Sequence, residues 1–324
     1  MYESRSGLYA FFGVLGLLAV VRVGMAYFLA PPNLVIPLSL LTTVVFVAAP
    51  VLALFQAGRH PWTPKLAGLF VVSGMLLQFG LPAITNGLGG ILTVFGSALG
   101  QQGLPIWTVG LGALLATLLK DKNLLLPVSI FLALFDIFLV FTPVGFVQVL
   151  MKQHPNLLPA VAHGIPQVAT SVKQLGLPIG TFAYVGPADF VFMAMFFVAL
   201  TRFSMRVGQT FKWLLVALAV YLPLAFIVGP VPLLVPIGLA VLGVNIREFQ
   251  MNKEEKLSTL FIAILGVAIV AYAATRPKPT PQVVPSPEPS VQDSSESADL
   301  PGQASPDQRP SSTPGAPKST PSRQ

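Results

Sequence analysis

The 324-residue sequence contains no cysteine, which excludes disulfide bonds, thiolate catalysis and cysteine-bound metals. Its three histidines, His60, His154 and His163, fall in loop-like stretches, and no His-Glu-x-x-His zinc motif is present. The Gly-rich loop with Lys-Ser/Thr that cradles nucleotide phosphates is also missing, so ATP-driven work has no support. We therefore expect no metal and no cofactor.

Charge is scarce as well. Charged residues make up 10% of the chain and hydrophobic residues 54%, whereas a soluble domain carries about 25% charged residues. Apolar runs approach the roughly 20 residues needed to cross a bilayer, so the composition predicts a polytopic membrane protein with the lipid bilayer as its surroundings. The net charge of +7 comes from loops, so it indicates loop charge in a membrane protein, and we expect no nucleic-acid partner.

The apolar runs predict an all-α transmembrane bundle of about nine spans, within a range of eight to ten. Residues 87–103 are ambiguous: they fit a short span, a re-entrant segment, or the first half of a long helix continuing to residue 119. The nine other spans are expected at 7–29, 34–55, 66–85, 104–119, 124–149, 181–201, 211–229, 231–246 and 257–274. The first of these lacks a clear cleavage site and is expected to be a retained span rather than a removed signal.

The basic residues of the loops predict an orientation. If the chain has nine spans, most of the basic residues lie on the same side of the membrane as the N-terminus. The positive-inside rule assigns that side to the cytoplasm. The loop 151–180 then lies on the opposite side, and a short interfacial helix is expected near 158–175. The basic residues concerned are Arg59, Lys65, Lys120, Lys122, Arg202, Arg206, Lys212, Arg247, Lys253 and Lys256. A multi-pass protein of the plasma (inner) membrane is the expected location.

The composition changes abruptly after the last span. Residues 1–275 are expected to form the transmembrane domain, whereas 276–324 are rich in Pro, Ser, Gln and Thr and have no long apolar run. Such a segment cannot bury enough surface to offset its ordering entropy, so it is predicted to be a disordered tail. The tail fits a loose tether or a binding segment for an unidentified partner.

Two acids lie inside the predicted spans, Asp136 in LALFDIFLVF and Asp189 in YVGPADFVFM. A carboxylate near the middle of a bilayer costs roughly 3 kcal/mol or more, so intramembrane acids are functional candidates. Consecutive spans run antiparallel, and both acids are expected near mid-bilayer, about 12 and 8 residues into their spans. Neighbouring helices would then bring the two side chains face to face.

Two close carboxylates in a medium of low dielectric cannot both ionise, so they share a proton and titrate as a unit. This suits aspartic proteolysis, in which one carboxylate activates water and the other, protonated, polarises the scissile carbonyl. The same pair suits proton- or cation-coupled transport, so the acids alone leave both functions open. A noncatalytic membrane scaffold, with aspartates that only bridge helices, is a third reading.

The neighbours of the acids narrow the choice. Gly186, Pro187 and Ala188 place small or rigid residues directly before Asp189, as a close approach of substrate backbone requires. The segment PVPLLVP, residues 230–236, holds three prolines that leave backbone groups unpaired, which membranes tolerate only inside protein or beside a wet cavity. Such backbone can pair with an extended peptide.

These elements resemble the presenilin and signal peptide peptidase family of intramembrane aspartyl proteases. The matching motifs are Phe135-Asp136, Gly186-Pro187-Ala188-Asp189-Phe190, and Pro232-Leu233-Leu234, in the family's order and approximate spacing over residues 120–246. The chain looks like a divergent, prokaryotic-like member, with Phe135 where the family has Tyr and Ala188 where it has Gly. The resemblance implies that Asp136 and Asp189 are the catalytic dyad of a peptidase acting on transmembrane or signal-peptide-like substrates. It also implies that Gly186, Pro187, Ala188, Pro230, Pro232, Leu233 and Leu234 hold the substrate.

Arg22 is the remaining charge inside a span. We expect it to reach an interface or to pair with a backbone carbonyl, in a structural role.

Overall fold

The chain folds mainly into helices. The computed structural model describes residues 3–142, 158–171, 181–228 and 231–275. In chain order the helices are α1 (Glu3–Met25), α2 (Val35–Gly58), α3 (Pro64–Met75), the π-helical turn η2 (Leu76–Gly80), α4 (Leu81–Thr85), α5 (Gly90–Leu118), α6 (Leu125–Phe141), α8 (Leu158–Val161), α9 (Pro187–Arg202), α10 (Val207–Val228), α11 (Leu234–Asn245) and α12 (Lys253–Ala274). Short 3-10 turns, Pro32–Leu34, Lys122–Leu124 and Ile246–Glu248, precede α2 and α6 and follow α11.

Five helical segments in the described part of the chain are long and apolar enough to cross a membrane. They are Ser6–Met25, Pro32–Gly58, Pro64–Thr85, Lys122–Phe141 and Lys253–Ala274. The expectation of nine such spans is therefore met only in part. Two expected spans are too short by themselves, because α9 has 16 residues and α11 has 12, against the roughly 20 that a bilayer requires. The five segments identify the chain as a helical membrane protein.

The ambiguous segment 87–103 is the first part of a long helix, which was one of the three expectations. Helix α5 runs without interruption for 29 residues, about 43 Å at 1.5 Å per residue. It lies against α3, η2 and α4 through a face of glycines. A Cβ atom on Gly100 would stand 2.6 Å from Pro82, and one on Gly110 would stand 2.5 Å from the carbonyl oxygen of Ala67. The small residues at 96–100 thus allow close helix packing.

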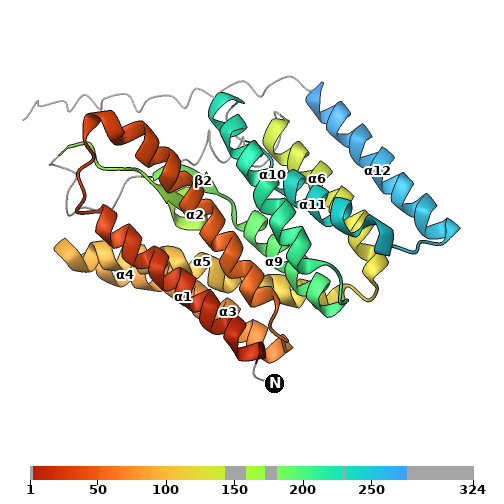
Figure 1. Cartoon of the computed structure of the whole chain (residues 1–324), viewed down its shortest axis with the longest axis horizontal. Helices are drawn as coiled ribbons and strands as arrows, with labels where there is room; N and C mark the ends of the chain where they lie inside the picture. Colours follow the sequence, from red (N-terminus) through yellow and green to blue (C-terminus); the bar gives the residue numbers. More distant parts are fainter. Residues whose placement is uncertain (1–2, 143–157, 172–180, 229–230, 276–324) are drawn as a thin grey trace, which may run out of the picture. The chain divides into compact units, whose positions relative to one another are not determined.

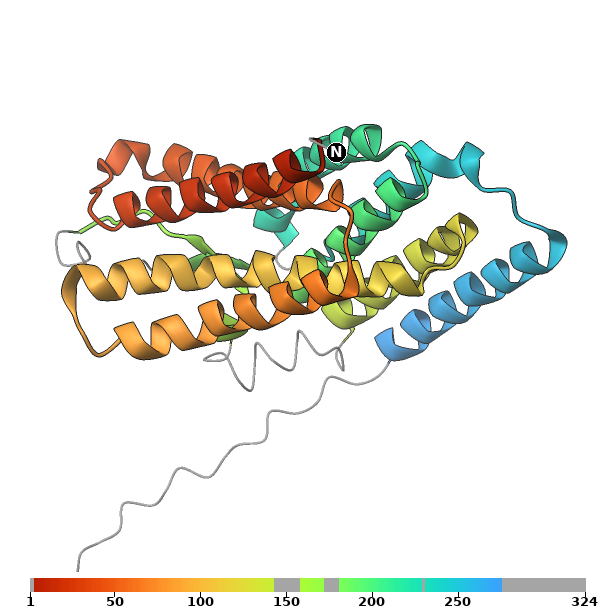
Figure 2. The ribbon, with the colours of Figure 1, turned by 90° about the horizontal axis from the view of Figure 1, so that it is seen from below.

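Helix α9 forms the centre of the helical unit, Met1–Pro279. It packs against α5 on one side and α2 on another, and α11 also touches it. Ten of its residues are buried, including Phe196 and Phe197. Helix α1 lies along α2, and α6 packs between α11 and α12 (Figures 1 and 2). The helix that carries Asp189 is therefore enclosed by protein on several sides.

A small antiparallel ribbon departs from the all-α expectation. Strand β1 (His163–Pro166) pairs with β2 (Thr181–Val185), with His163 opposite Val185 and Ile165 opposite Ala183. The expected helix near 158–175 is wrong for the described residues 158–171: of these, only the single turn α8 is helical, and all four residues of β1 are buried. The expected span 181–201 is also wrong at its start, because β2 occupies its first five residues and the helix begins at Pro187.

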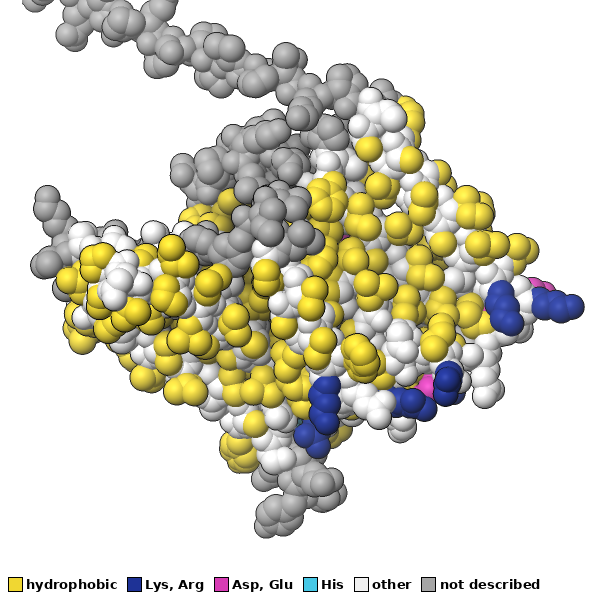
Figure 3. Space-filling view, turned by 45° about the horizontal axis from the view of Figure 1, so that its top comes forward, with side chains coloured by type: hydrophobic (Ala, Val, Ile, Leu, Met, Phe, Trp, Pro, Cys, Tyr) yellow, Lys and Arg dark blue, Asp and Glu magenta, His cyan; other side chains and the backbone are white. Residues whose placement is uncertain are grey.

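The basic residues gather in alternate helix connections. They lie at the ends of helices, in the connections α2–α3, α5–α6, α9–α10 and α11–α12. Every second connection along the chain is one of these four. If successive helices run antiparallel, every second connection lies at the same end of the bundle, so the basic residues share that end. Figure 3 shows Lys and Arg at the lower and right-hand margin of a face on which hydrophobic side chains are widespread. A bilayer-facing surface with a charged rim has this distribution.

Some predictions fall outside the described residues. The tail 276–324, Pro230, most of the 151–180 loop and the last part of the expected 124–149 span belong to this group.

Candidate active site

Asp136 lies on the buried face of α6. It is the twelfth residue of the helix, as predicted, and its neighbours on that face are Ser129, Leu132 and Val140, all buried at helical spacing. Asp136 itself is 7% exposed. Phe135, next to it, is 40% exposed and stacks on Phe131 on the outer face. The helix thus turns the acid inward and the aromatic residues outward.

The carboxylate of Asp136 binds the start of α11. Residues 231–233 are not helical, and α11 begins at Leu234. The first N–H groups of a helix have no partner within it, and the N–H of Leu234 donates to Oδ2 of Asp136 at 2.7 Å. Pro236 removes a further donor from the same turn. Pro232 and Leu234 are buried here and Leu233 is half-buried, so the proline-rich segment and the first acid form one site.

Asp189 lies at the start of α9 rather than eight residues into a span. Gly186 is the N-cap, Pro187 the first helical residue and Asp189 the third. Oδ2 of Asp189 accepts the N–H of Gly186 at 3.1 Å, which closes the first turn as a capping interaction. A Cβ atom on Gly186 would stand 3.2 Å from this oxygen, tighter than usual contact, so a small residue fits best there. Ala188 is exposed, and Pro187 and Asp189 are partly exposed.

The two acids lie on helices that share a neighbour. Helices α6 and α9 do not form the face-to-face pair that was expected. Instead α6 packs chiefly against α11 and α12, and α11 also contacts α9. Helix α11 therefore joins the two acidic helices.

Tyr221 of α10 is a further residue to consider near the site. It is half-buried, and α10 packs against α11, the helix whose first N–H binds Asp136. Nothing in the sequence pattern pointed to it, since a tyrosine in an apolar helix is common at membrane interfaces. Its phenol is noteworthy because Phe135 has no hydroxyl group.

The ribbon leads directly into the second acid. Val185 ends β2, and Gly186 follows it at the cap of α9. Opposite Val185, the fully buried ring of His163 meets the ring of Phe190 edge-on, with centroids 5.6 Å apart. The backbone before Asp189 is thus extended and held by β1.

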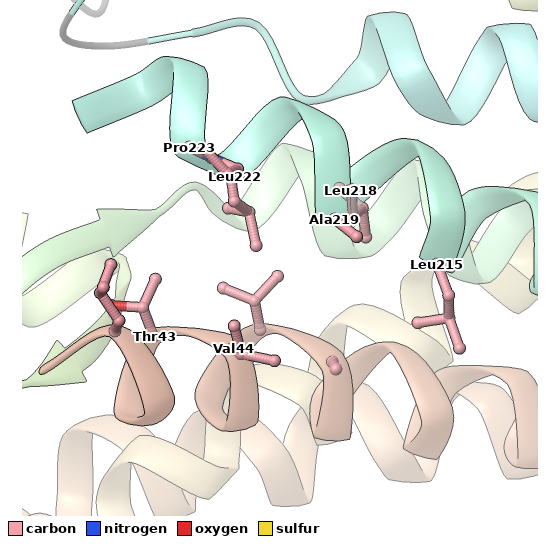
Figure 4. A pocket seen from close by; sticks show the side chains of 10 residues that line it. Thr43, Val44, Leu215, Leu218, Ala219, Leu222 and Pro223 are labelled. Carbon is pink, nitrogen blue, oxygen red and sulfur yellow. The ribbon is translucent and has the colours of Figure 1, made fainter. Parts of the chain in front are cut away.

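An apolar groove lies elsewhere on the molecule, between α2 and α10. Its volume is about 160 Å³, and ten residues line it, including Thr43, Val44, Leu218 and Leu222 (Figure 4). Its lining includes neither aspartate. Within the described residues no group of three or more His, Asp or Glu side chains is placed to hold a metal ion.

Comparison with protein-family models, with curated proteins and with solved structures found no match.

Chemically, the site offers two carboxyl groups that are each oriented by one backbone N–H. A fixed orientation suits acid–base chemistry, because the reacting oxygen atoms need not reorganise during the reaction. The site also offers irregular backbone at 231–233 and extended backbone at 181–185. Backbone of this kind can pair with an extended peptide.

Proposed function

We propose that the protein is an intramembrane aspartyl endopeptidase of the presenilin and signal peptide peptidase type. The observation that carries the proposal is the hydrogen bond from the N–H of Leu234 to Asp136, which joins the first acid to the proline-rich segment. This bond joins two elements that lie 98 residues apart in sequence, and α11 also contacts α9, the helix that carries Asp189. The order and chemistry of the two acids and the proline-rich segment are those that the resemblance implies.

In the proposed reaction the two carboxyl groups hold one proton between them. The ionised group takes a proton from water as the water oxygen attacks the scissile carbonyl carbon. The protonated group donates a hydrogen bond to the carbonyl oxygen and stabilises the tetrahedral intermediate. Collapse of the intermediate breaks the C–N bond, and a proton passes to the leaving amine. No cofactor enters this sequence.

The proposed substrate is a transmembrane or signal-peptide-like segment that unwinds near the acids. An extended peptide pairs readily with an open strand edge or unpaired backbone. The ribbon has only two strands among the described residues, so β2 keeps one edge without a strand partner there. Because β2 ends at Val185, directly before the cap of α9, a peptide added along it would run toward Asp189.

The proposed location is the plasma (inner) membrane, with the basic helix connections on the cytoplasmic side. Since the basic α11–α12 connection is then cytoplasmic, the tail 276–324 would follow α12 to the opposite side, where a tether or partner-binding role is open. The basic connections described above support the orientation.

One observation also fits a proton- or cation-coupled transporter. Residues 231–233 interrupt the helical path beside Asp136, and discontinuous helices beside intramembrane acids are typical of transporter ion sites. Small residues before Asp189 and the strand that leads to it favour the peptidase.

A reporter test separates the two functions. The purified protein is placed in liposomes with a single-span reporter peptide, and products are identified by mass. The parent should cleave, whereas Asp136→Ala and Asp189→Ala should be inactive at equal expression. Ion-dependent uptake without cleavage, abolished by the same substitutions, would favour the transporter; cleavage retained by both variants would end the peptidase proposal.

A further inference from the structure

Polar side chains from distant helices hold the segment 158–166. Gln101 of α5 reaches both ends of it: its Oε1 accepts the N–H of Gly164 at 2.9 Å, and its Nε2 lies 3.4 Å from the carbonyl oxygen of Pro159. The segment is 58 to 63 residues away in sequence. One carboxamide therefore fixes the spacing between α8 and β1.

A second contact comes from the π-helical turn η2. The Nε2 of Gln78 donates to the carbonyl oxygen of Ala160 at 2.7 Å, and its Oε1 accepts from Nε1 of Trp107 at 2.6 Å. Gln78 is 6% exposed, so its carboxamide is held on both sides. π-Helical turns occur frequently at functional sites, because the extra residue redirects side chains.

The third contact is made by Arg22 of α1. Its guanidinium donates to the carbonyl oxygen of Gly164, as expected for a pairing with backbone, and stacks over Phe46 at 5.1 Å. Arg22 is 6% exposed. Burying an arginine inside a membrane span costs free energy. Its hydrogen bond to one strand carbonyl therefore indicates a specific role for this side chain.

The neighbouring Gln102 shows what an ordinary buried glutamine does in this helix. Its Nε2 donates to the carbonyl oxygen of Ala98, four residues earlier in α5, at 3.3 Å. Gln102 thus stays within its own helix, whereas Arg22, Gln78 and Gln101 all reach out to 158–166. The three form a set that we call the β1 anchor.

We infer that the β1 anchor, Arg22, Gln78 and Gln101, consists of positioning residues that fix the register of β1 on β2 and thereby select the peptide bond presented to Asp189. The inference rests on the proposed function for its last step. Gly164 is bound on both its N–H and its carbonyl oxygen, directly beside the pair His163–Val185. Val185 precedes the cap of α9, so a shift of β1 would move the backbone that enters the acid site. With four residues, one of them glycine, β1 has few side chains of its own to specify the register.

The absence of cysteine allows a direct measurement of this register. In the double variant Ile165→Cys/Ala183→Cys the thiols lie opposite each other in the ribbon, and mild oxidation should join them in membranes. The pair Ile165→Cys/Val185→Cys reports a slip of two residues.

Adding Gln101→Met, which has similar volume but no hydrogen bonds, should lower the cross-link yield of the first pair at least threefold and raise that of the second. The control Gln102→Met should leave both yields unchanged. Gln101→Asn, whose amide is too short to bridge both backbone groups, is the milder variant and should act in the same direction. Unchanged yields, or an equal fall with Gln102→Met, would overturn the inference.

Cleavage tests the consequence. If the parent cuts the reporter, Gln101→Met should lower kcat about tenfold and leave KM within about twofold. The product masses should then show cleavage at a neighbouring peptide bond. Arg22→Lys should keep more cleavage at the parent's bond than Arg22→Met. An unshifted product pattern at parental kcat would overturn selection by the anchor. A parent that cuts nothing contradicts the proposed function alone, because the cross-links still decide the register.

Discussion

The hydrogen bond between Leu234 and Asp136 predicts how substitutions at Asp136 change stability. Asp136→Asn keeps an oxygen acceptor of the same reach, and Asp136→Leu keeps the branched shape without one. Both remove the charge, so their difference isolates the acceptor. A buried N–H that loses its only partner costs about 1–3 kcal/mol, and Leu234 is 3% exposed. Asp136→Leu should therefore be less stable than Asp136→Asn by an amount in this range.

Thermal unfolding in detergent, followed by circular dichroism, measures this difference. About 2–4 °C of midpoint corresponds to 1 kcal/mol in chains of 150–250 residues, so a drop of several degrees is expected between the two variants. Asp121, which accepts an N–H from Asn123 at 3.0 Å in an exposed loop, provides the control for the loss of charge: Asp121→Asn should change the midpoint little. Equal midpoints for Asp136→Asn and Asp136→Leu would refute the idea that Asp136 holds the proline-rich segment.

Two further predictions concern the surroundings of Asp189. A Cβ atom on Gly112 would stand 2.6 Å from the carbonyl oxygen of Val191. Gly112→Ala should therefore push α9 away from α5, lower the free energy of unfolding by roughly 1–3 kcal/mol and reduce cleavage. Gly68→Ala, with no neighbour within 4 Å, is the control and should change neither stability nor cleavage. Burial, and secondarily the charge of Arg22, lowers the pKa of His163 from 6.5 to about 3. Between pH 6.5 and pH 3 the imidazole is protonated in the unfolded chain but neutral in the folded chain. The free energy of unfolding is therefore unaffected above pH 6.5 and decreases as the pH falls toward 3, by about 2 kcal/mol at pH 5. His163→Leu should flatten this part of the melting-midpoint curve against pH, and an unchanged slope would contradict a buried neutral ring.

The sequence predicted the helical membrane class and the place of Asp136 because both depend on long apolar runs. It also predicted the irregular backbone of PVPLLVP, since proline acts locally. The ribbon was missed: β1 is only four residues long and ends in Pro166, so it leaves no alternating pattern to detect. The start of α9 did carry a signal, because proline at the first helical position and an acid in the first turn mark a helix N-terminus.

The β1 anchor could not be found from sequence, because its partners are backbone groups up to 142 residues away. A glutamine that crosses to another segment and one that bonds within its own helix look alike in sequence, as Gln101 and Gln102 show. Tyr221 was missed for the same reason, since its place depends on how α10 packs against α11. Long-range side-chain partners require the fold.

The central claim is that Asp136 and Asp189 act as one catalytic unit on a peptide bond. The most direct test measures reporter cleavage by Asp136→Asn, Asp189→Asn and the double variant, each in liposomes at equal protein. Residues that act as a unit lose their effect together rather than additively, so all three should fall to the same background while Asp121→Asn retains parental activity. Cleavage retained by either single variant, or a double variant markedly slower than both singles, would contradict the account.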